Sequence, residues 1–200
     1  MSGGLVLSNI KSFLLLGFIA SILINVLLIN KLVTKENASS LSFDSDEISF
    51  AFSDVVNDPK TLLLDAINEA NNTLDIAIYN FEDKEIAQVI LNAHNRGVNV
   101  RIITDASKAK KNDQAAILNE FSQNNIDVKI NTARKMHLKT AIIDDRLIVT
   151  GSYNFTEASA DENLEQLMIL SNEELAQEWT GIFADLWNRS DFKKWEQLSK

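Results

Sequence analysis

Between residues 46 and 190 the sequence alternates short β-rich runs with longer amphipathic stretches, and this alternation limits the possible folds more than any other feature. The β-rich runs lie at 48–53, 73–81, 98–106 and 126–131. Helical patterns separate them, at 58–71, 83–95 and 112–124. Gly97 follows the second helical pattern directly and suits a helix C-cap. This order predicts an α/β domain whose mostly parallel central sheet is flanked by helices.

The domain continues beyond residue 131. We expect two strands at 136–144 and 146–152 joined by a turn, a third at 163–170 and a last helix at roughly 173–188. Because 46% of the residues are apolar and only one is proline, the chain can bury a substantial core. We therefore assign residues 47–200 to one domain.

The N-terminal part differs in kind from this domain. Residues 13–29, FLLLGFIASILINVLLI, carry no charge, and lysines flank them at positions 11 and 31. The run just spans a bilayer core, lacks a polar face and is not followed by a small-residue cleavage pattern, which disfavours a core helix and a cleaved signal peptide. We expect a transmembrane helix in a membrane anchor at 1–35, a polar linker at 36–46, and a single-pass protein of a bacterial cell membrane.

Composition excludes some chemistry and restricts the partners. The chain has no cysteine, so disulfides, thiolate catalysis and cysteine-bound zinc are excluded. Its net charge of -9 repels nucleic acid and anionic membranes on average. Eight basic residues against four acidic ones nevertheless fall between Arg101 and Lys139. This basic segment is either a solvated surface or a guide for a polyanion or an anionic lipid headgroup.

His137 and Lys139 interrupt the apolar alternation of the strand expected at 136–144. Residues two apart in a strand point to the same side, so the two side chains should project together. A single histidine would usually be structural, and a single lysine solvated. Together they predict a pocket for an anion such as phosphate, because lysine supplies fixed charge and histidine can attack or carry protons near neutral pH.

The residues around this pair form a pattern that is known from one family. HLKTAIID is H-x-K-x4-D, GSYN follows as G-S-x-N, and ENLEQ supplies a later acid; the positions are His137, Lys139, Asp144, Gly151, Ser152, Asn154 and Glu165. The pattern resembles the phospholipase D superfamily, in particular its short single-motif members, which include endonucleases and cardiolipin hydrolases. The alternating strands and helices agree with the fold of that family.

The resemblance implies a role for each motif residue. His137 would attack phosphorus and form a phosphohistidine intermediate. Lys139 and Asn154 would bind the nonbridging oxygens and stabilise the charge that builds there. Glu165 would hold the other imidazole nitrogen, as a triad acid does.

Two further motif residues complete the predicted site. Asp144 ends the strand on the face opposite His137, and we expect it to support the catalytic residues from behind. Ser152 is a candidate for hydrogen bonding to substrate, beside Gly151, where backbone should approach closely.

The mechanism implied by the family needs two histidines, and the chain carries one motif. His94, the second histidine, lies late in a helix without a lysine partner, and we interpret it as a surface residue. A homodimer in which each chain contributes one motif to a single composite site would resolve this deficit. We expect no cofactor and no metal, because no acidic cluster has cation-ligand spacing.

Three functions remain open at this point. The membrane anchor favours a phosphodiesterase that acts on phospholipid, because a tethered site meets lipid at high effective concentration. The main alternative is a membrane-tethered endonuclease that acts on DNA or RNA. An inactive scaffold that binds phospholipid or only dimerises is disfavoured, because it would need no nucleophile.

Overall fold

A computed structural model describes residues 21–22, 24–25 and 47–195 of the 200-residue chain. The expected linker lies outside these residues, and so does almost all of the expected membrane anchor. Of the residues described, none belongs to a helix that is long and apolar enough to cross a membrane.

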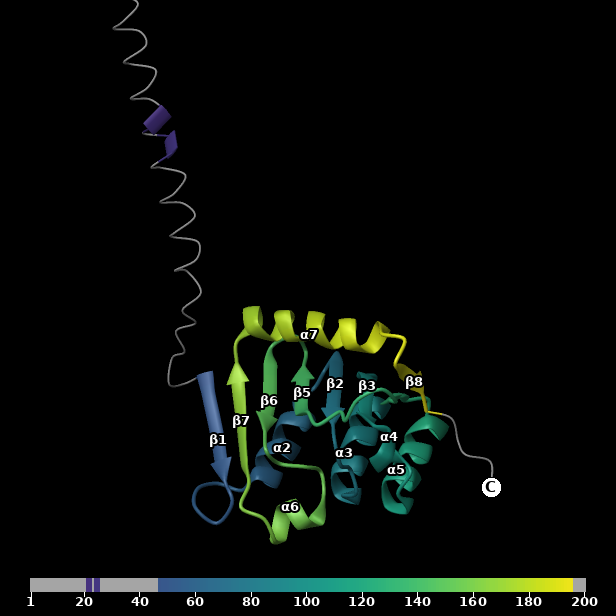
Figure 1. Ribbon diagram of the computed structural model, residues 1–200. Helices are drawn as coiled ribbons and strands as arrows, with labels where there is room; N and C mark the ends of the chain where they lie inside the picture. The colour runs from purple at the N-terminus through teal and green to yellow at the C-terminus, as the bar shows by residue number, and fades with distance from the viewer. Residues whose placement is uncertain (1–20, 23, 26–46, 196–200) are drawn as a thin grey trace, which may run out of the picture. The chain divides into compact units, whose positions relative to one another are not determined.

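The described part of the domain contains an eight-stranded sheet in the order β1-β7-β6-β5-β2-β3-β4-β8 (Figure 1). The strands are β1 (Ile48–Phe52), β2 (Thr73–Ile78), β3 (Asn99–Asp105), β4 (Asp127–Asn131), β5 (Lys139–Ile143), β6 (Leu147–Gly151), β7 (Gln166–Ser171) and β8 (Phe192–Lys194). Seven of them lie where the sequence predicted strands, with ends that differ by up to three residues. The short edge strand β8 was not predicted.

The sheet is mixed, so the expectation of a mostly parallel sheet was wrong. Only the β2–β3 and β3–β4 pairs are parallel, and the other five pairs are antiparallel. Parallel pairs need a crossover connection, which here the helices between β2, β3 and β4 supply. After β4 an irregular loop leads into β5, and a tight turn joins β5 to β6. β1 lies at the far edge of the sheet, where it pairs with β7 instead of with β2.

The helices are α2 (Pro59–Asn68), α3 (Lys84–Asn95), α4 (Ala106–Ala109), α5 (Asn112–Gln123), α6 (Glu157–Asp161) and α7 (Glu173–Asn188). The four long ones match the predicted helices closely, and α4 and α6 are short helices that the sequence analysis did not predict. Asp58, Asp83 and Asn172 cap α2, α3 and α7 by accepting hydrogen bonds from backbone N–H groups of the first turn.

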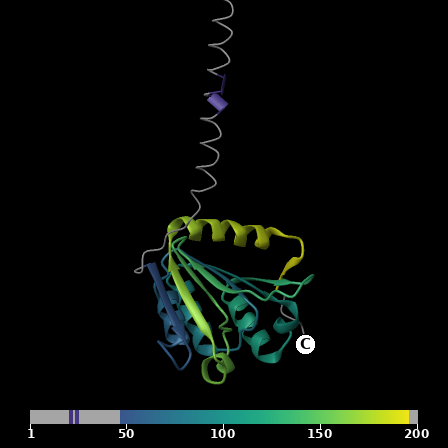
Figure 2. The same cartoon turned by 60° about the vertical axis from the view of Figure 1, so that its left-hand side comes forward.

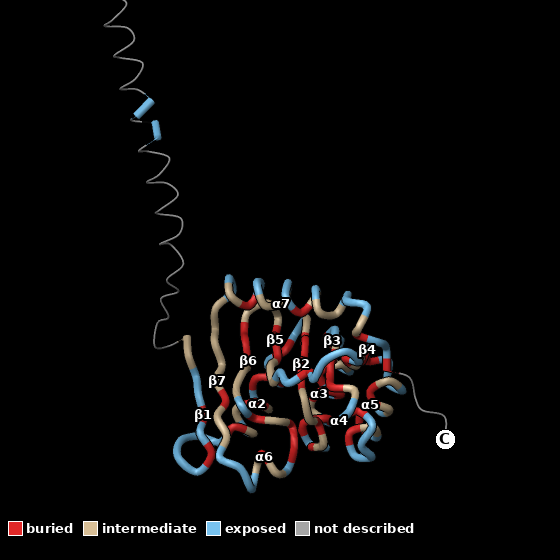
Figure 3. The backbone as a smooth tube through the Cα atoms, in the orientation of Figure 1, coloured by how far each residue is buried: buried red, intermediate tan, exposed pale blue. Residues whose placement is uncertain are grey.

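Helices cover both faces of the sheet, with α7 on one face and α2, α3 and α5 on the other (Figure 2). Because successive strand residues point to opposite faces, neighbouring residues join different cores. Ile76 and Ile78 pack in the larger core under α2, α3 and α5, whereas Ala77 packs in a smaller core with Phe183 of α7. Figure 3 shows the central strands buried over most of their length, as expected for a sheet that is covered on both faces.

The strand ends that carry the predicted site lie together along one side of the sheet, at right angles to its outer strands, and we call this side the site edge. The registers place the C-terminal ends of β2, β3 and β6 beside the N-terminal ends of β5 and β7. The opposite edge carries the β5–β6 turn, in which Asp144 and Asp145 both have φ of 53°. Positive φ at both central residues is typical of a type I′ hairpin turn.

Candidate active site

His137 and Lys139 lie side by side at the site edge of the sheet. Lys139 opens β5, and its Nζ atom is 3.4 Å from Nδ1 of His137 and 3.3 Å from the His137 carbonyl oxygen. The strand begins later than predicted, so His137 lies in the preceding loop and is exposed. The backbone N–H of Tyr79 donates to the Leu138 carbonyl (2.9 Å), which continues the pairing of β2 and β5 toward His137. The prediction that the two side chains project together is confirmed.

Tyr79, directly after β2, forms one wall of the site. Its ring lies 4.5 Å from the imidazole of His137, centre to centre, with the two planes tilted by 54°. The sequence analysis did not assign Tyr79 to the site, although its position at the end of a β-rich run was a usable signal. Packing against this ring restricts the orientations open to the imidazole.

Asp105 positions the loop that carries His137, and the sequence analysis missed it. One carboxylate oxygen caps α4 by accepting from the backbone N–H groups of Ser107 (2.9 Å) and Lys108 (3.3 Å). The other accepts from the backbone N–H of Met136 (3.0 Å), the residue before His137. Burial alone would raise the pKa of Asp105, but the hydrogen bonds from Ser107 and Met136 hold it below the ordinary value. Asp105 therefore binds the loop as a carboxylate.

The surroundings of His137 favour the neutral imidazole. Partial removal from water lowers its pKa, and the positive charges of Lys139, Lys135 and Lys108 lower it further, while Asp105 opposes them. A neutral imidazole keeps the lone pair that a nucleophile needs. The site therefore holds His137 in its reactive form near neutral pH.

Ser152 and Asn154 follow β6 and approach the site from the other side. The backbone N–H of Phe155 donates to the Asn80 carbonyl (3.1 Å), which joins the segments that follow β2 and β6. The side-chain oxygens of Asn154 and Asn80 are buried and accept no hydrogen bond within the described residues. Buried polar atoms without partners are uncommon and are expected where a ligand binds. Rotation of either amide would present its NH₂ donor instead.

Glu165, directly before β7, is held in a network of hydroxyl and amide groups. Its carboxylate accepts hydrogen bonds from the Ser152 hydroxyl, the Ser159 hydroxyl (3.4 Å) and the Asn163 side chain (3.3 Å). Its backbone N–H donates to the Ser53 hydroxyl (3.1 Å). Within the described part of one chain, Glu165 makes no hydrogen bond to His137. The predicted hold of Glu165 on an imidazole, of its own chain or of a partner, thus remains a prediction.

The negative charge of the Glu165 carboxylate also acts on Lys139. Burial lowers the pKa of Lys139, the negative charge of Glu165 opposes that shift, and Lys135 adds to it. The ammonium group is therefore only partly compensated by Glu165, and it stays available for the oxygens of a phosphate.

The structure does not bring Asp144 to the site. Asp144 lies in the turn at the other end of β5, where its carboxylate accepts from the backbone N–H groups of Asn71 (2.9 Å), Asn72 (2.7 Å) and Thr73 (2.8 Å). Burial raises its pKa, but these three bonds lower it below the ordinary value overall. Asp144 thus ties the α2–β2 connection to the β5–β6 turn.

The remaining sequence candidates also have defined places. His94 lies at the end of α3, which leads into the start of β3, so it is at the edge of the sheet opposite His137. Gly151 ends β6, and a Cβ atom there would collide with the carbonyl of Gln166 on β7. The expected close approach of backbone at Gly151 is confirmed.

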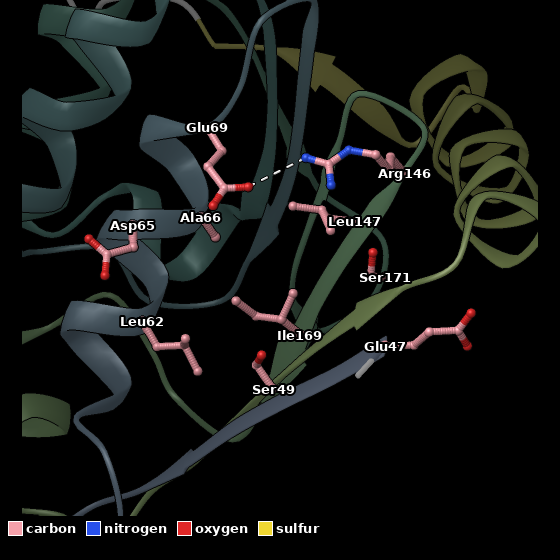
Figure 4. A pocket seen from close by; sticks show the side chains of 10 residues that line it. All are labelled: Glu47, Ser49, Leu62, Asp65, Ala66, Glu69, Arg146, Leu147, Ile169 and Ser171. Atoms are coloured by element: carbon pink, nitrogen blue, oxygen red, sulfur yellow. Dashed lines mark hydrogen bonds and ion pairs between the residues drawn. The ribbon is translucent and has the colours of Figure 1, made fainter. Parts of the chain in front are cut away.

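A separate pocket of about 250 Å³ lies beside α2 at the edge opposite His137 (Figure 4). Its lining includes the C-terminal part of β7 and the ion pair between Glu69 and Arg146, whose charged atoms are 3.4 Å apart. No histidine lines it, and it shares no residue with the site around His137. In the described ranges, no group of three or more acidic or histidine side chains could hold a metal ion.

The site combines an imidazole whose pKa is lowered, an ammonium group and an amide whose buried oxygen has no hydrogen-bond partner among the described residues. These groups suit nucleophilic attack on phosphorus and the binding of its nonbridging oxygens. Fold and site thus define an α/β protein with a candidate site for a phosphoryl group.

The chain belongs to the phospholipase D superfamily, since residues 63–187 match the family model described as cardiolipin synthase, PLD-like domain. It is 38% identical over 126 residues to a mitochondrial cardiolipin hydrolase of Chlamydomonas reinhardtii, covering 62% of this chain and 56% of the relative. It is 35% identical over 114 residues to a phospholipase D of Rickettsia conorii, covering 56% of each chain. The chain thus spans little more than half the length of these relatives.

Solved structures support the same family. Nuc of Salmonella typhimurium, a phospholipase D family member, superposes with a TM-score of 0.70 at 25% identity, covering 74% of this chain and 97% of that one. NucT from Helicobacter pylori has the same fold, with a TM-score of 0.64 at 24% identity, over 74% of this chain and 100% of that one.

Proposed function

We propose that this protein hydrolyses a phosphodiester through a phosphohistidine intermediate, at a site shared by two chains, and that its substrate is a phospholipid. The observation that carries the proposal is the contact between Nδ1 of His137 and Nζ of Lys139, 3.4 Å apart, in surroundings that lower the pKa of the imidazole. The first group supplies a nucleophile, and the second supplies charge for the phosphoryl oxygens.

The first chemical step transfers the phosphoryl group to the protein. One ring nitrogen of His137 attacks phosphorus, a nitrogen–phosphorus bond forms, and the bond from phosphorus to the leaving oxygen breaks. Lys139 and Asn154 bind the nonbridging oxygens as charge builds on them. The leaving oxygen takes a proton from a general acid, so an alcohol departs.

The second step returns the protein to its starting state. The former general acid accepts a proton from water, the water oxygen attacks phosphorus, and the nitrogen–phosphorus bond breaks. A phosphomonoester leaves, and His137 is free again.

A second copy of the chain would supply that general acid. The only other histidine of the sequence, His94, lies at the opposite edge of the sheet and cannot serve. A two-fold axis near His137 would bring His137 of the partner subunit to the leaving oxygen. The same arrangement would let Glu165 contact an imidazole that it does not reach within one chain, and its carboxylate charge would favour the protonated form that a general acid requires.

Phospholipid is the favoured substrate for two reasons. The similar proteins named above are a cardiolipin hydrolase and a phospholipase D. Residues 13–29 have the composition of a membrane anchor, which would keep the site at a lipid surface. Location in a membrane therefore forms part of this proposal.

Nucleic acid is the alternative substrate, because the short single-motif members that the sequence resembles include endonucleases. The superposition with Nuc also covers nearly all of that structure. Against it, base stacking needs a free aromatic face, and the Tyr79 ring already packs against His137 and is approached by lysines. An inactive scaffold is disfavoured by the intact arrangement of His137, Lys139 and Asn154.

Hydrolysis assays on the full chain in detergent test the proposal. We would supply bis(p-nitrophenyl) phosphate as a reporter, phosphatidylglycerol in mixed micelles and a single-stranded DNA, with His137→Ala as the control. Turnover of the reporter and of the lipid would support the proposal. Turnover of DNA but not of lipid would favour the nuclease, and no turnover of any substrate would favour the scaffold.

A further inference from the structure

The basic segment between Arg101 and Lys139 divides into separate groups in the fold. Arg101 and Lys129 lie under α7: the Arg101 guanidinium bonds Asp75 (2.7 Å), and Lys129 donates to the Trp187 carbonyl (2.7 Å). Lys110, Lys111 and Arg134 are exposed and contact no ring or carboxylate in the described part of the chain. Only three of the eight basic residues remain, and these three converge.

Lys108, Lys135 and Lys139 surround the ring of Tyr79. Their Nζ atoms lie 5.0, 4.8 and 5.4 Å from the centre of this ring. Any two of the ammonium groups are therefore within about twice that distance of each other. They come from α4, from the loop before β5 and from β5 itself, so the fold assembles the cluster.

Lys108 and Lys135 have no carboxylate partner in the part of the chain that the structure describes. Neither forms an ion pair with any described residue, and the nearby Asp105 carboxylate is engaged by backbone N–H groups and by Ser107. The face of an aromatic ring attracts cations but does not cancel their mutual repulsion. Three cations gathered in a chain of net charge -9 therefore indicate a binding place for an anion.

In the proposed mechanism Lys139 and Asn154 bind the oxygens of the scissile phosphate, which leaves Lys108 and Lys135 without an assigned ligand. We propose that Lys108, Lys135 and Tyr79 form a second phosphate subsite, which binds the other phosphate of a phospholipid whose headgroup carries two. The subsite rests on the proposed function, since it deepens the specificity of the same site.

A lipid fits the subsite better than a nucleic acid. A stacked base would need the Tyr79 ring face, which the imidazole and the lysines already surround. Leu138 is 45% exposed next to His137, and Leu164 is 81% exposed next to Glu165. Exposed apolar side chains at the rim of a charged site suit contact with a lipid surface.

The test compares two lipids that differ by one phosphate, phosphatidylglycerol and phosphatidylglycerol phosphate. The full chain is assayed on each in detergent micelles at equal surface concentration, and the ratio of the two kcat/KM values is taken. We expect wild type to prefer the lipid with two phosphates. The variant with both Lys108→Ala and Lys135→Ala should lower the ratio at least about tenfold, mainly through KM, because charged hydrogen bonds are lost.

Two comparisons separate the subsite from general effects. The variant with both Lys110→Ala and Lys111→Ala removes equal charge from the same segment and should keep the ratio. Tyr79→Phe keeps the ring and should keep the ratio, whereas Tyr79→Leu should lower it. The ratio cancels any loss of turnover that is common to both lipids.

The failure of the subsite and the failure of the proposed function look different. An equal ratio in wild type and in the Lys108/Lys135 variant, with the reporter still hydrolysed, would overturn the subsite alone. A nucleotide substrate, thymidine 5′-(p-nitrophenyl phosphate), is assayed with and without a second phosphate at its 3′ position. If replacing Lys108 and Lys135 slows hydrolysis of the 3′-phosphorylated nucleotide alone, and of neither lipid, the assignment of the subsite to lipid is overturned.

A binding measurement covers the case without turnover. In the His137→Ala background, the full chain in detergent micelles should bind phosphatidylglycerol phosphate more weakly in calorimetric titration when Lys108 and Lys135 are replaced. Unchanged affinity would overturn the subsite whether or not the protein is a hydrolase.

Discussion

The Nζ atom of Lys139 lies 3.4 Å from Nδ1 of His137, although the strand that was expected to align the two residues begins only at Lys139. The ammonium group of Lys139 has two effects at this distance. Its charge disfavours a positive charge on the imidazole, and its N–H groups can donate to the oxygens of a phosphate. The first two predictions below concern groups linked to this pair.

Replacement of His137 by alanine should lower turnover of the reporter by several orders of magnitude, because the attacking atom is lost. His94→Ala is the matched control, since it removes the other histidine at the opposite edge of the sheet and should leave turnover near wild type. Steady-state kinetics and circular dichroism on both variants check the result. More than about a tenth of normal activity in His137→Ala would contradict the assignment, because general acid–base help alone is worth at least about a hundredfold.

Removal of the Lys135 charge should raise the pKa of His137. The folded protein holds this pKa below the ordinary value of 6.5, through partial burial first and then through Lys139 and Lys135. With Lys135→Ala one cause of the lowering disappears, so the acid limb of kcat/KM should move to higher pH. NMR titration of the imidazole measures the shift directly, and Lys110→Ala is the charge-matched control. A shift in the other direction would show that the charge of Lys135 does not act on His137.

Replacement of Asp144 by alanine should destabilise the fold. Three backbone N–H groups at 71–73 lose their acceptor, and we expect a loss of about 1–3 kcal/mol in the free energy of unfolding. Asp144→Asn keeps one oxygen acceptor and should lose less. Urea unfolding followed by circular dichroism gives both values. A fully stable Asp144→Ala protein that had lost its turnover would return Asp144 to the catalytic residues.

Gly151→Ala should destabilise the protein by roughly 1–3 kcal/mol or more, because the added methyl group meets the Gln166 carbonyl and the β6–β7 pair must separate. Gly181→Ala is the control: this glycine lies in α7 with open space around it, and alanine there should stabilise the helix by about 0.5–1 kcal/mol. Thermal unfolding compares the two. Equal stability of both variants would mean that β6 and β7 are not as close as described.

Mixing of subunits tests the composite site. When wild-type chains exchange with an excess of His137→Ala chains, a mixed dimer holds only one motif histidine and should be nearly inactive. Activity should then follow the square of the wild-type fraction. Linear dependence, or a fully active monomer in sedimentation, would show that one chain suffices.

The sequence was sufficient to predict most of the strands and helices, and to predict that His137 and Lys139 lie side by side. Apolar periodicity placed seven strands and four long helices, because it reports which face of each element is buried. It could not show which strands are neighbours, since an alternating pattern does not encode its partner. The parallel expectation therefore failed for β1, whose pairing with β7 joins distant parts of the chain.

Residues that act through tertiary contacts were the ones missed. Asp105 ends β3 and Tyr79 directly follows β2, and they meet the His137 loop only because the sheet places the ends of these two parallel strands together. Lys108 and Lys135 were visible only as members of a basic segment. Nothing in their spacing shows that they converge on one ring, because they come from a short helix and an irregular loop.

The β5 strand fixes the distance between two attachments at opposite edges of the sheet. Lys139 must face the phosphate at one end, while Asp144, just past the other end, must reach the N–H groups at 71–73. Deletion of one residue within Lys139–Ile143 would either turn Lys139 to the wrong face or pull Asp144 off its partners. The length of this strand is thus as much a part of the motif as its residue types. Insertions and deletions that leave the protein functional should fall outside it.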